Sequence, residues 1–103
     1  NSKLQTIGNR AFYFSKIRKF SIPPSLKKIC ESAFYNCQNL CQIDIPTNSE
    51  LQIIEKDAFA YSSIKSLFIP SKVVELQEGW CRETRKLTTI EIMEDNKNYK
   101  IFF

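Results

Sequence analysis

The chain of 103 residues contains no histidine and only two glycines, Gly8 and Gly79. Histidine is the side chain that most often acts as general base, as zinc or copper ligand, or as partner of a serine or cysteine nucleophile. Two isolated glycines cannot form the glycine-rich loop that cradles a phosphate. We therefore expect that the protein is not an enzyme and that it has no catalytic residues, no metal site and no cofactor.

Long apolar runs and concentrated charge are missing as well. No apolar stretch approaches the ~20 residues of a membrane-spanning helix, so we expect no direct insertion into a membrane. The net charge is +4, and the basic residues are spread along the chain with one local excess between Lys16 and Lys28. Proteins that bind nucleic acids usually gather positive charge into one patch. We interpret this excess as a solvated face and expect no nucleic-acid partner.

What the sequence does contain is an internal repeat. An Ala-Phe pair recurs, with a Trp-Cys variant at the fourth position, at steps of 22, 25 and 22 residues. Two apolar residues three positions apart precede each pair, an apolar triplet follows it, and proline closes three of the four triplets. The pairs are Ala11-Phe12, Ala33-Phe34, Ala58-Phe59 and Trp80-Cys81; the triplets are Ile17, Phe20 and Ile22, then Leu40, Ile43 and Ile45, then Ile64, Leu67 and Ile69, then Leu87, Ile90 and Ile92.

Each unit has a physical interpretation. The ends of the triplets alternate apolar and polar residues, except that Phe68 takes the polar position in the third, and this is the period of a strand with one buried face. Proline then ends the strand, because it has no N–H to offer. A unit of ~23 residues cannot bury its own apolar side, whereas stacked units can. We therefore expect one mainly β solenoid over residues 1–103, of about four coils, with a parallel sheet on one face, little helix, and Phe34 and Phe59 in its core. The repeats are expected at about 4–23, 26–46, 51–70 and 73–93, followed by a tail at 94–103.

The repeat carries a resemblance to a known family. The pattern Leu40-x-x-Ile43-x-Ile45-Pro46, followed by Leu51-x-x-Ile54 and Ala58-Phe59, resembles the BspA-like class of leucine-rich repeats. The fourth unit, around Trp80-Cys81 and up to Tyr99, is similar to versions from parasitic protists. The resemblance implies a right-handed stack in a cell-surface or secreted protein that adheres to host cells, matrix proteins or other microbes. The chain opens in the middle of the pattern, so we expect it to be cut from a longer polypeptide, and the lack of a recognisable signal peptide or anchor within it therefore says little.

The four cysteines invite a zinc or disulfide interpretation, but none of them forms a Cys-x-x-Cys pair. The repeat register favours free thiols instead. Cys37 aligns with Ser15, Ser62 and Thr84 and is expected to be a structural thiol inside a turn. Cys81 falls in the column of the repeated phenylalanine and should be buried, whereas Cys30 and Cys41 fall in columns that suggest exposure.

Strand geometry defines a candidate partner-binding face. If the central residue of each triplet points inward, its two neighbours point outward and together cover one face of a four-stranded parallel sheet. Solenoids commonly bind partners on such a face. Phe68 lies near its middle, either as an interface anchor or as one scattered apolar surface residue. The face consists of Lys19, Ser21, Gln42, Asp44, Ser66, Phe68, Thr89 and Glu91.

These features favour a protein-binding or adhesion repeat module that presents a concave sheet face to a protein, host or matrix ligand. The alternative is a non-enzymatic structural spacer or an intracellular scaffold repeat. Terminal coils without neighbours would expose apolar side chains and strand edges. We therefore expect self-association through the ends, unless Ile101 to Phe103 folds back as a cap.

Overall fold

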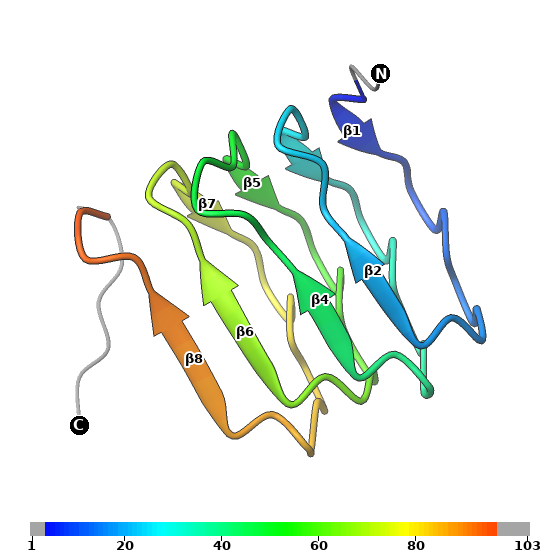
Figure 1. The fold of residues 1–103 in the computed structure, drawn as a ribbon. Coiled ribbons are helices and arrows are strands. Elements are labelled where there is room, and N and C mark those ends of the chain that lie inside the picture. The colour runs from blue at the N-terminus through cyan, green and yellow to red at the C-terminus, as the bar shows by residue number, and fades with distance from the viewer. Residues whose placement is uncertain (1–3, 97–103) are drawn as a thin grey trace.

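Residues 4–96, which are the residues that the structure describes, form eight short β-strands and no helix in a computed structural model (Figure 1). The strands are two to four residues long. They are β1 (Thr6–Ile7), β2 (Lys19–Ser21), β3 (Lys28–Ile29), β4 (Gln42–Asp44), β5 (Ile53–Ile54), β6 (Ser66–Ile69), β7 (Glu75–Leu76) and β8 (Thr89–Ile92).

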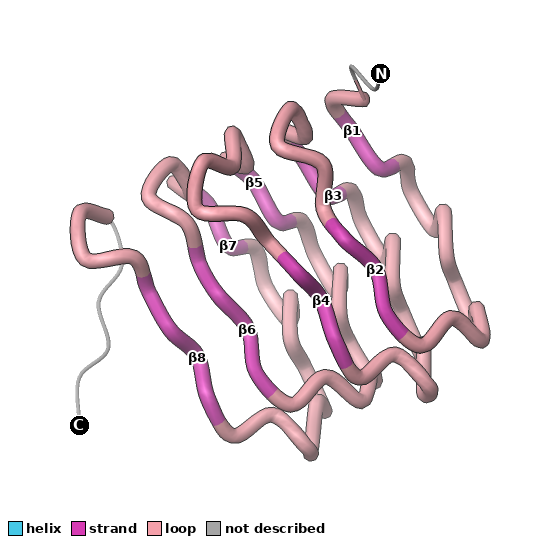
Figure 2. The backbone as a smooth tube through the Cα atoms, in the orientation of Figure 1, coloured by secondary structure: helices cyan, strands magenta, loops and turns pink. Residues whose placement is uncertain are grey.

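Successive strands lie on opposite sides of a flattened coil (Figures 1 and 2). On one side, β1, β3, β5 and β7 form a four-stranded parallel sheet in that order. On the other side, β2, β4, β6 and β8 lie next to one another, with Phe20 opposite Ile43 and Leu67 opposite Ile90. The protein is thus a β-solenoid of about four coils, and the parallel strands predicted around the triplets are confirmed.

The distribution of hydrogen bonds between strands differs from the expected single four-stranded sheet over the triplets. Here β2 pairs with β4 and β6 pairs with β8, but no ladder joins β4 to β6. The two strands still pack together, and the coils are linked just before them by a hydrogen bond from the Ser63 amide to the Leu40 carbonyl, 3.1 Å. The continuous sheet lies on the opposite side, in segments that the sequence indicated only as return runs.

The core fills the space between the two sides. The inward apolar positions of both strand sets are buried in the interior coils, whereas Phe20, Leu76 and Ile90 in the end coils are partly buried. The repeated phenylalanines stack along the solenoid, with ring centroids 5.1 Å apart between Phe12 and Phe34 and 5.2 Å apart between Phe34 and Phe59. Phe34 and Phe59 are fully buried, as predicted, because a coil covers each of them on both sides.

The turns around the Ala-Phe pairs share one backbone conformation. Two positions in every coil have positive φ, a region that costs ordinary residues energy and suits glycine. Seven of these eight residues are not glycine, and the eighth is Gly79. Hydrogen bonds between coils hold the turns: the amides of Phe12, Phe34 and Phe59 donate to the carbonyls of Ala33, Ala58 and Trp80 at 2.7–2.8 Å. The first set of positive-φ positions is Arg10, Ser32, Asp57 and Gly79, and the second is Phe14, Asn36, Tyr61 and Glu83.

A buried asparagine closes the described part of the last coil. Asn96 is 2% exposed, and its side-chain amide donates to the carbonyls of Pro70 and Val73 at 2.9 and 3.2 Å. It begins a new turn in the way that Leu26 and Val73 do, with its own amide bonded three residues back. The predicted cap at Ile101 to Phe103 lies outside the described residues.

Candidate functional site

The outward positions of β2, β4, β6 and β8 form a polar face. Exposure alternates along these strands, so the residues on either side of Phe20, Ile43, Leu67 and Ile90 point away from the core. The face has two rows running across the strands. One row is Lys19, Gln42, Ser66 and Thr89, and the other is Ser21, Asp44, Phe68 and Glu91.

Phe68 is less exposed than the sequence pattern suggested. All the other residues of this face are exposed, whereas Phe68 is partly buried. An extended polar side chain can leave the sheet surface, but a phenyl ring lowers its free energy by lying against its neighbours. Phe68 therefore presents part of its ring within a polar surface.

Charge is unevenly distributed over the face. In the second row, Phe68 lies opposite Glu91 on β8, and Asp44 occupies the same row on the adjacent strand β4. The Gln42 side-chain amide donates to both carboxylate oxygens of Asp44, at 2.8 and 3.1 Å, which fixes that carboxylate on the surface. The single cation of the face, Lys19, lies on β2. The two strands next to β6 thus each carry one acidic side chain at the position equivalent to Phe68.

A second surface feature was not predicted from the sequence. Aromatic side chains of successive coils meet at the turns, where Tyr13 stacks on Tyr35 at 5.2 Å and Tyr35 lies 5.4 Å from Tyr61. Phe14 contacts this row and is 53% exposed, and the Arg10 guanidinium lies 5.3 Å above the Tyr13 ring. The signal was present in the sequence, since each of these aromatic residues follows an Ala-Phe pair within two positions.

The cysteines are free thiols in this part of the chain. Cys37 is buried, and its thiol donates to the Phe12 carbonyl at 2.9 Å, which agrees with the predicted structural role inside a turn. Burial raises the pKa of the Cys37 thiol, and a backbone hydrogen bond opposes that shift. Cys41 is exposed, and Cys30 is only partly so.

Cys81 is partly buried rather than fully buried as predicted. It does occupy the phenylalanine column, because the Phe59 amide donates to the Trp80 carbonyl just as the Phe34 amide donates to the Ala58 carbonyl. Among residues 4–96, however, no further coil covers it. Burial still raises its pKa, partly offset by the hydrogen bond with Thr84.

Within residues 4–96, no cluster of three or more histidine, cysteine, aspartate or glutamate side chains could hold a metal ion. The same residues include no helix long and apolar enough to cross a membrane. The candidate site is the surface described above, defined by strand register and turn geometry.

Comparison with known proteins places this solenoid in a family. The sequence model described as the BspA type leucine rich repeat region matches residues 1–102 in six copies. The chain belongs to this family. The leucine-rich-repeat interpretation of the sequence is thereby confirmed. No curated protein sequence matches the chain.

Solved structures agree with this assignment. The chain is similar to the pneumococcal vaccine antigen PcpA, with a TM-score of 0.90 and 34% identity over 93% of this chain and 24% of that one. It is also similar to a leucine-rich repeat protein from Bacteroides capillosus, with a TM-score of 0.76 and 28% identity over 86% of this chain and 63% of that one. A leucine rich cell surface protein from Faecalibacterium prausnitzii shares the fold at 21% identity, with a TM-score of 0.75, over 90% of this chain and 30% of that one. The chain thus spans about a quarter of the length of the pneumococcal antigen.

Proposed function

We propose that this leucine-rich-repeat module is a non-catalytic adhesion or protein-binding segment whose partner docks on the face made by β2, β4, β6 and β8. The observation that carries the proposal is the position of Phe68, a partly exposed ring in an otherwise polar sheet face. Aromatic side chains of this kind supply much of the binding energy in protein interfaces.

The charges around Phe68 indicate what the partner presents. Asp44 and Glu91 lie in the same row as the ring, on the strands to either side of β6. An arginine or lysine of the partner can lie over the ring and pair with one of these carboxylates. We therefore propose a protein or matrix partner with a basic side chain at the centre of its contact surface.

We further propose that the parent protein acts at the cell surface or outside the cell. The similar structures include a protein called a vaccine antigen and one called a cell surface protein, and these names support an exposed location. The resemblance of the fourth unit, around Trp80-Cys81, to versions from protists is part of the same proposal, whereas the similar solved structures named above are bacterial.

The test is to change the two central residues of the face. Phe68→Ala combined with Asp44→Lys should abolish binding of the partner captured by the intact parent protein from a matrix-protein array, while the circular dichroism spectrum shows that the fold is intact. The charge reversal replaces attraction by repulsion, and the truncation removes the ring.

Two single variants away from the face are matched controls. Tyr13→Ala removes an exposed aromatic at the turns, and Glu94→Lys reverses an exposed charge beyond β8; neither should alter the affinity. Unchanged affinity in the Phe68 and Asp44 variants would instead favour the structural spacer or scaffold alternative, or binding at another surface.

A further inference from the structure

The turns of the solenoid alternate in length. Between the small polar residue of each turn and the triplet that follows, the first and third coils have one residue, Lys16 or Ser63. The second and fourth coils have two, as in Gln38 and Asn39. The structure therefore repeats most closely over pairs of coils, with a short turn followed by a long one.

Each short–long pair of turns borders a cavity that is open to solvent. The larger cavity, of about 370 Å³, lies between the third and fourth coils, and the smaller one, of about 190 Å³, lies between the first and second. Gln38 lines both, so the two cavities adjoin at this side chain. The larger is lined by Gln38, Tyr61, Ser62, Ser63, Glu83, Arg85 and Lys86, and the smaller by Phe14, Ser15, Lys16, Asn36, Gln38 and Asn39.

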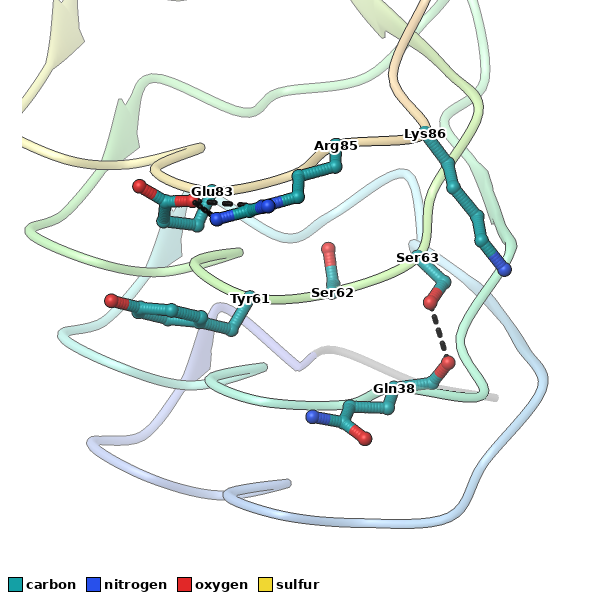
Figure 3. Close-up of a pocket in the computed structure, with 7 residues that line it drawn as sticks. All are labelled: Gln38, Tyr61, Ser62, Ser63, Glu83, Arg85 and Lys86. Carbon is teal, nitrogen blue, oxygen red and sulfur yellow. Dashed lines mark hydrogen bonds and ion pairs between the residues drawn. The ribbon is translucent and has the colours of Figure 1, made fainter.

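The larger cavity combines one aromatic ring with polar and charged groups (Figure 3). Tyr61 is 42% exposed and lies between the Glu83–Arg85 pair on one side and Gln38 on the other. Arg85 donates to the Glu83 carboxylate at 2.9–3.0 Å, which orients its guanidinium while leaving it largely in solvent. Lys86 is exposed. No aliphatic side chain lines the cavity, which makes it a poor fit for an apolar ligand.

The wall of this cavity holds an unsatisfied hydroxyl. Ser62 is 5% exposed, and its Oγ is buried without a hydrogen-bond partner among residues 4–96. The residues at the equivalent position in the neighbouring coils do have one: Cys37 donates to the Phe12 carbonyl, and Thr84 donates to the Cys81 carbonyl at 2.6 Å. A buried polar group left unpaired destabilises the protein, and a ligand group that reaches it would remove that cost.

From this arrangement we propose that the larger cavity binds an acidic saccharide. The C–H face of a pyranose ring stacks on Tyr61, while its hydroxyl groups exchange hydrogen bonds with Ser62, Gln38 and Glu83. Arg85 and Lys86 pair with the carboxylate or sulfate of the sugar.

The smaller cavity repeats the same chemistry with Phe14, Lys16 and side-chain amides. Because Gln38 lines both cavities, a linear acidic oligosaccharide can occupy the two in sequence. This surface is separate from the face proposed above for a protein partner, so either proposal can fail without the other.

The experiment is isothermal titration of the 103-residue chain with a hyaluronan hexasaccharide, whose alternate sugars carry a carboxylate. Neutral chitohexaose and a hexaglutamate peptide are the comparison probes. We expect the hyaluronan fragment to bind and both comparison probes to bind more weakly. Ser62→Ala and Tyr61→Ala should each weaken binding by roughly tenfold, as for the loss of one strong contact.

Ser62→Ala separates a ligand role from a structural one. Removing an unpaired buried hydroxyl should leave the melting temperature of the free chain unchanged or raised, so a loss of affinity cannot be attributed to unfolding. Tyr13→Ala, an exposed aromatic that lines neither cavity, is the matched control and should bind normally.

Three results would overturn the proposal. The first is no binding of the hyaluronan fragment. The second is equal binding of hexaglutamate, which would show a response to charge alone, or of chitohexaose, which would show that the acidic group is not recognised. The third is unchanged affinity in both the Ser62 and Tyr61 variants.

Discussion

At the scale of single residues, the stacked phenylalanines Phe12, Phe34 and Phe59 explain how coils of so few residues are stabilised. Phe34 stacks between Phe12 and Phe59 with nearly parallel rings, at interplanar angles of 9° and 10°. Phe20 also contacts Phe12 and Phe34, at 5.1 and 5.4 Å. Each ring thus contributes burial to two coils at once, and its loss affects the contact between coils as well as the coil that carries it.

Truncating this column should destabilise the protein strongly. Phe34→Ala or Phe59→Ala is expected to lower the free energy of unfolding by roughly 3–5 kcal/mol, the cost of a large cavity in a packed core. Urea denaturation followed by circular dichroism measures this. The control is Lys27→Ala at an exposed position, which should have little effect; variants of Phe34 and Phe59 that melt like the wild type would show that the stacked column does not stabilise the fold.

The thiols should differ in reactivity according to their burial. Cys41 is exposed, whereas desolvation raises the pKa values of Cys30, Cys37 and Cys81. A raised pKa means a smaller reactive thiolate fraction at a given pH, so alkylation of those three should be slower at neutral pH and should accelerate further into the alkaline range.

Alkylation with iodoacetamide, read by mass spectrometry of peptides, tests this order. Cys41 should be labelled first and Cys37 last, the latter mainly after unfolding. Labelling of Cys37 at the rate of Cys41 in the folded protein would contradict the buried position found for it.

At the scale of the turns, the positive-φ positions control how one coil follows the next. Arg10, Ser32 and Asp57 accept φ values of 57–58° there, and Gly79 has φ 70°. A Cβ at Gly79 would collide with the Asp57 carboxylate and the Arg82 guanidinium. These two groups form an ion pair of 2.7 Å that links the third and fourth coils and raises the pKa of Arg82.

Gly79→Ala should therefore destabilise the protein by about 1–2 kcal/mol, from left-handed strain and displacement of the ion pair. Gly8→Ala is the matched control, because no atom lies within 4 Å of its added Cβ and its φ is not positive. Its expected effect is neutral or slightly stabilising, since alanine reduces the freedom of the unfolded chain. Thermal melts of the two variants give the comparison, and equal melting temperatures would exclude the strain argument.

At the scale of the whole molecule, the solenoid has two ends. Within residues 4–96, β1 and β7 are the first and last strands of the four-stranded sheet, and β2 and β8 are the first and last strands of the opposite side. The end coils also expose more of their apolar residues, as Leu4 at 44% and the partly buried Trp80 and Leu87 illustrate. Exposed apolar surface of this kind favours contact with another copy.

We therefore predict that the 103-residue chain associates as its concentration rises. An end-to-end contact is heterologous and extends rather than closes, so the mean mass should grow continuously instead of stopping at a dimer. Light scattering over a concentration series measures this, with a second form lacking Ile101 to Phe103 for comparison. A strict monomer at high concentration in both forms would mean that the ends are already protected.

Much of this architecture could be predicted from local sequence pattern. Three sequence features indicate parallel coils: the four registers of apolar residues, the proline that ends three of the triplets, and the alternation within the triplets. A strand with a period of two has only one set of side chains that can point inward. The inward residues Phe20, Ile43, Leu67 and Ile90, and the outward polar residues beside them, follow from that period alone. The position of the Cys37 thiol inside a turn was predicted from the alignment of Cys37 with Ser15, Ser62 and Thr84.

Other features were decided by the tertiary structure, since they depend on distances between coils that no single coil encodes. The interruption between β4 and β6 arises where a long turn is followed by a short one. The partial burial of Phe68 and Cys81 depends on which neighbours cover them. The aromatic row, the two cavities and the unpaired Ser62 hydroxyl exist only because stacking brings residues from different coils together, residues that lie more than 20 positions apart in the sequence.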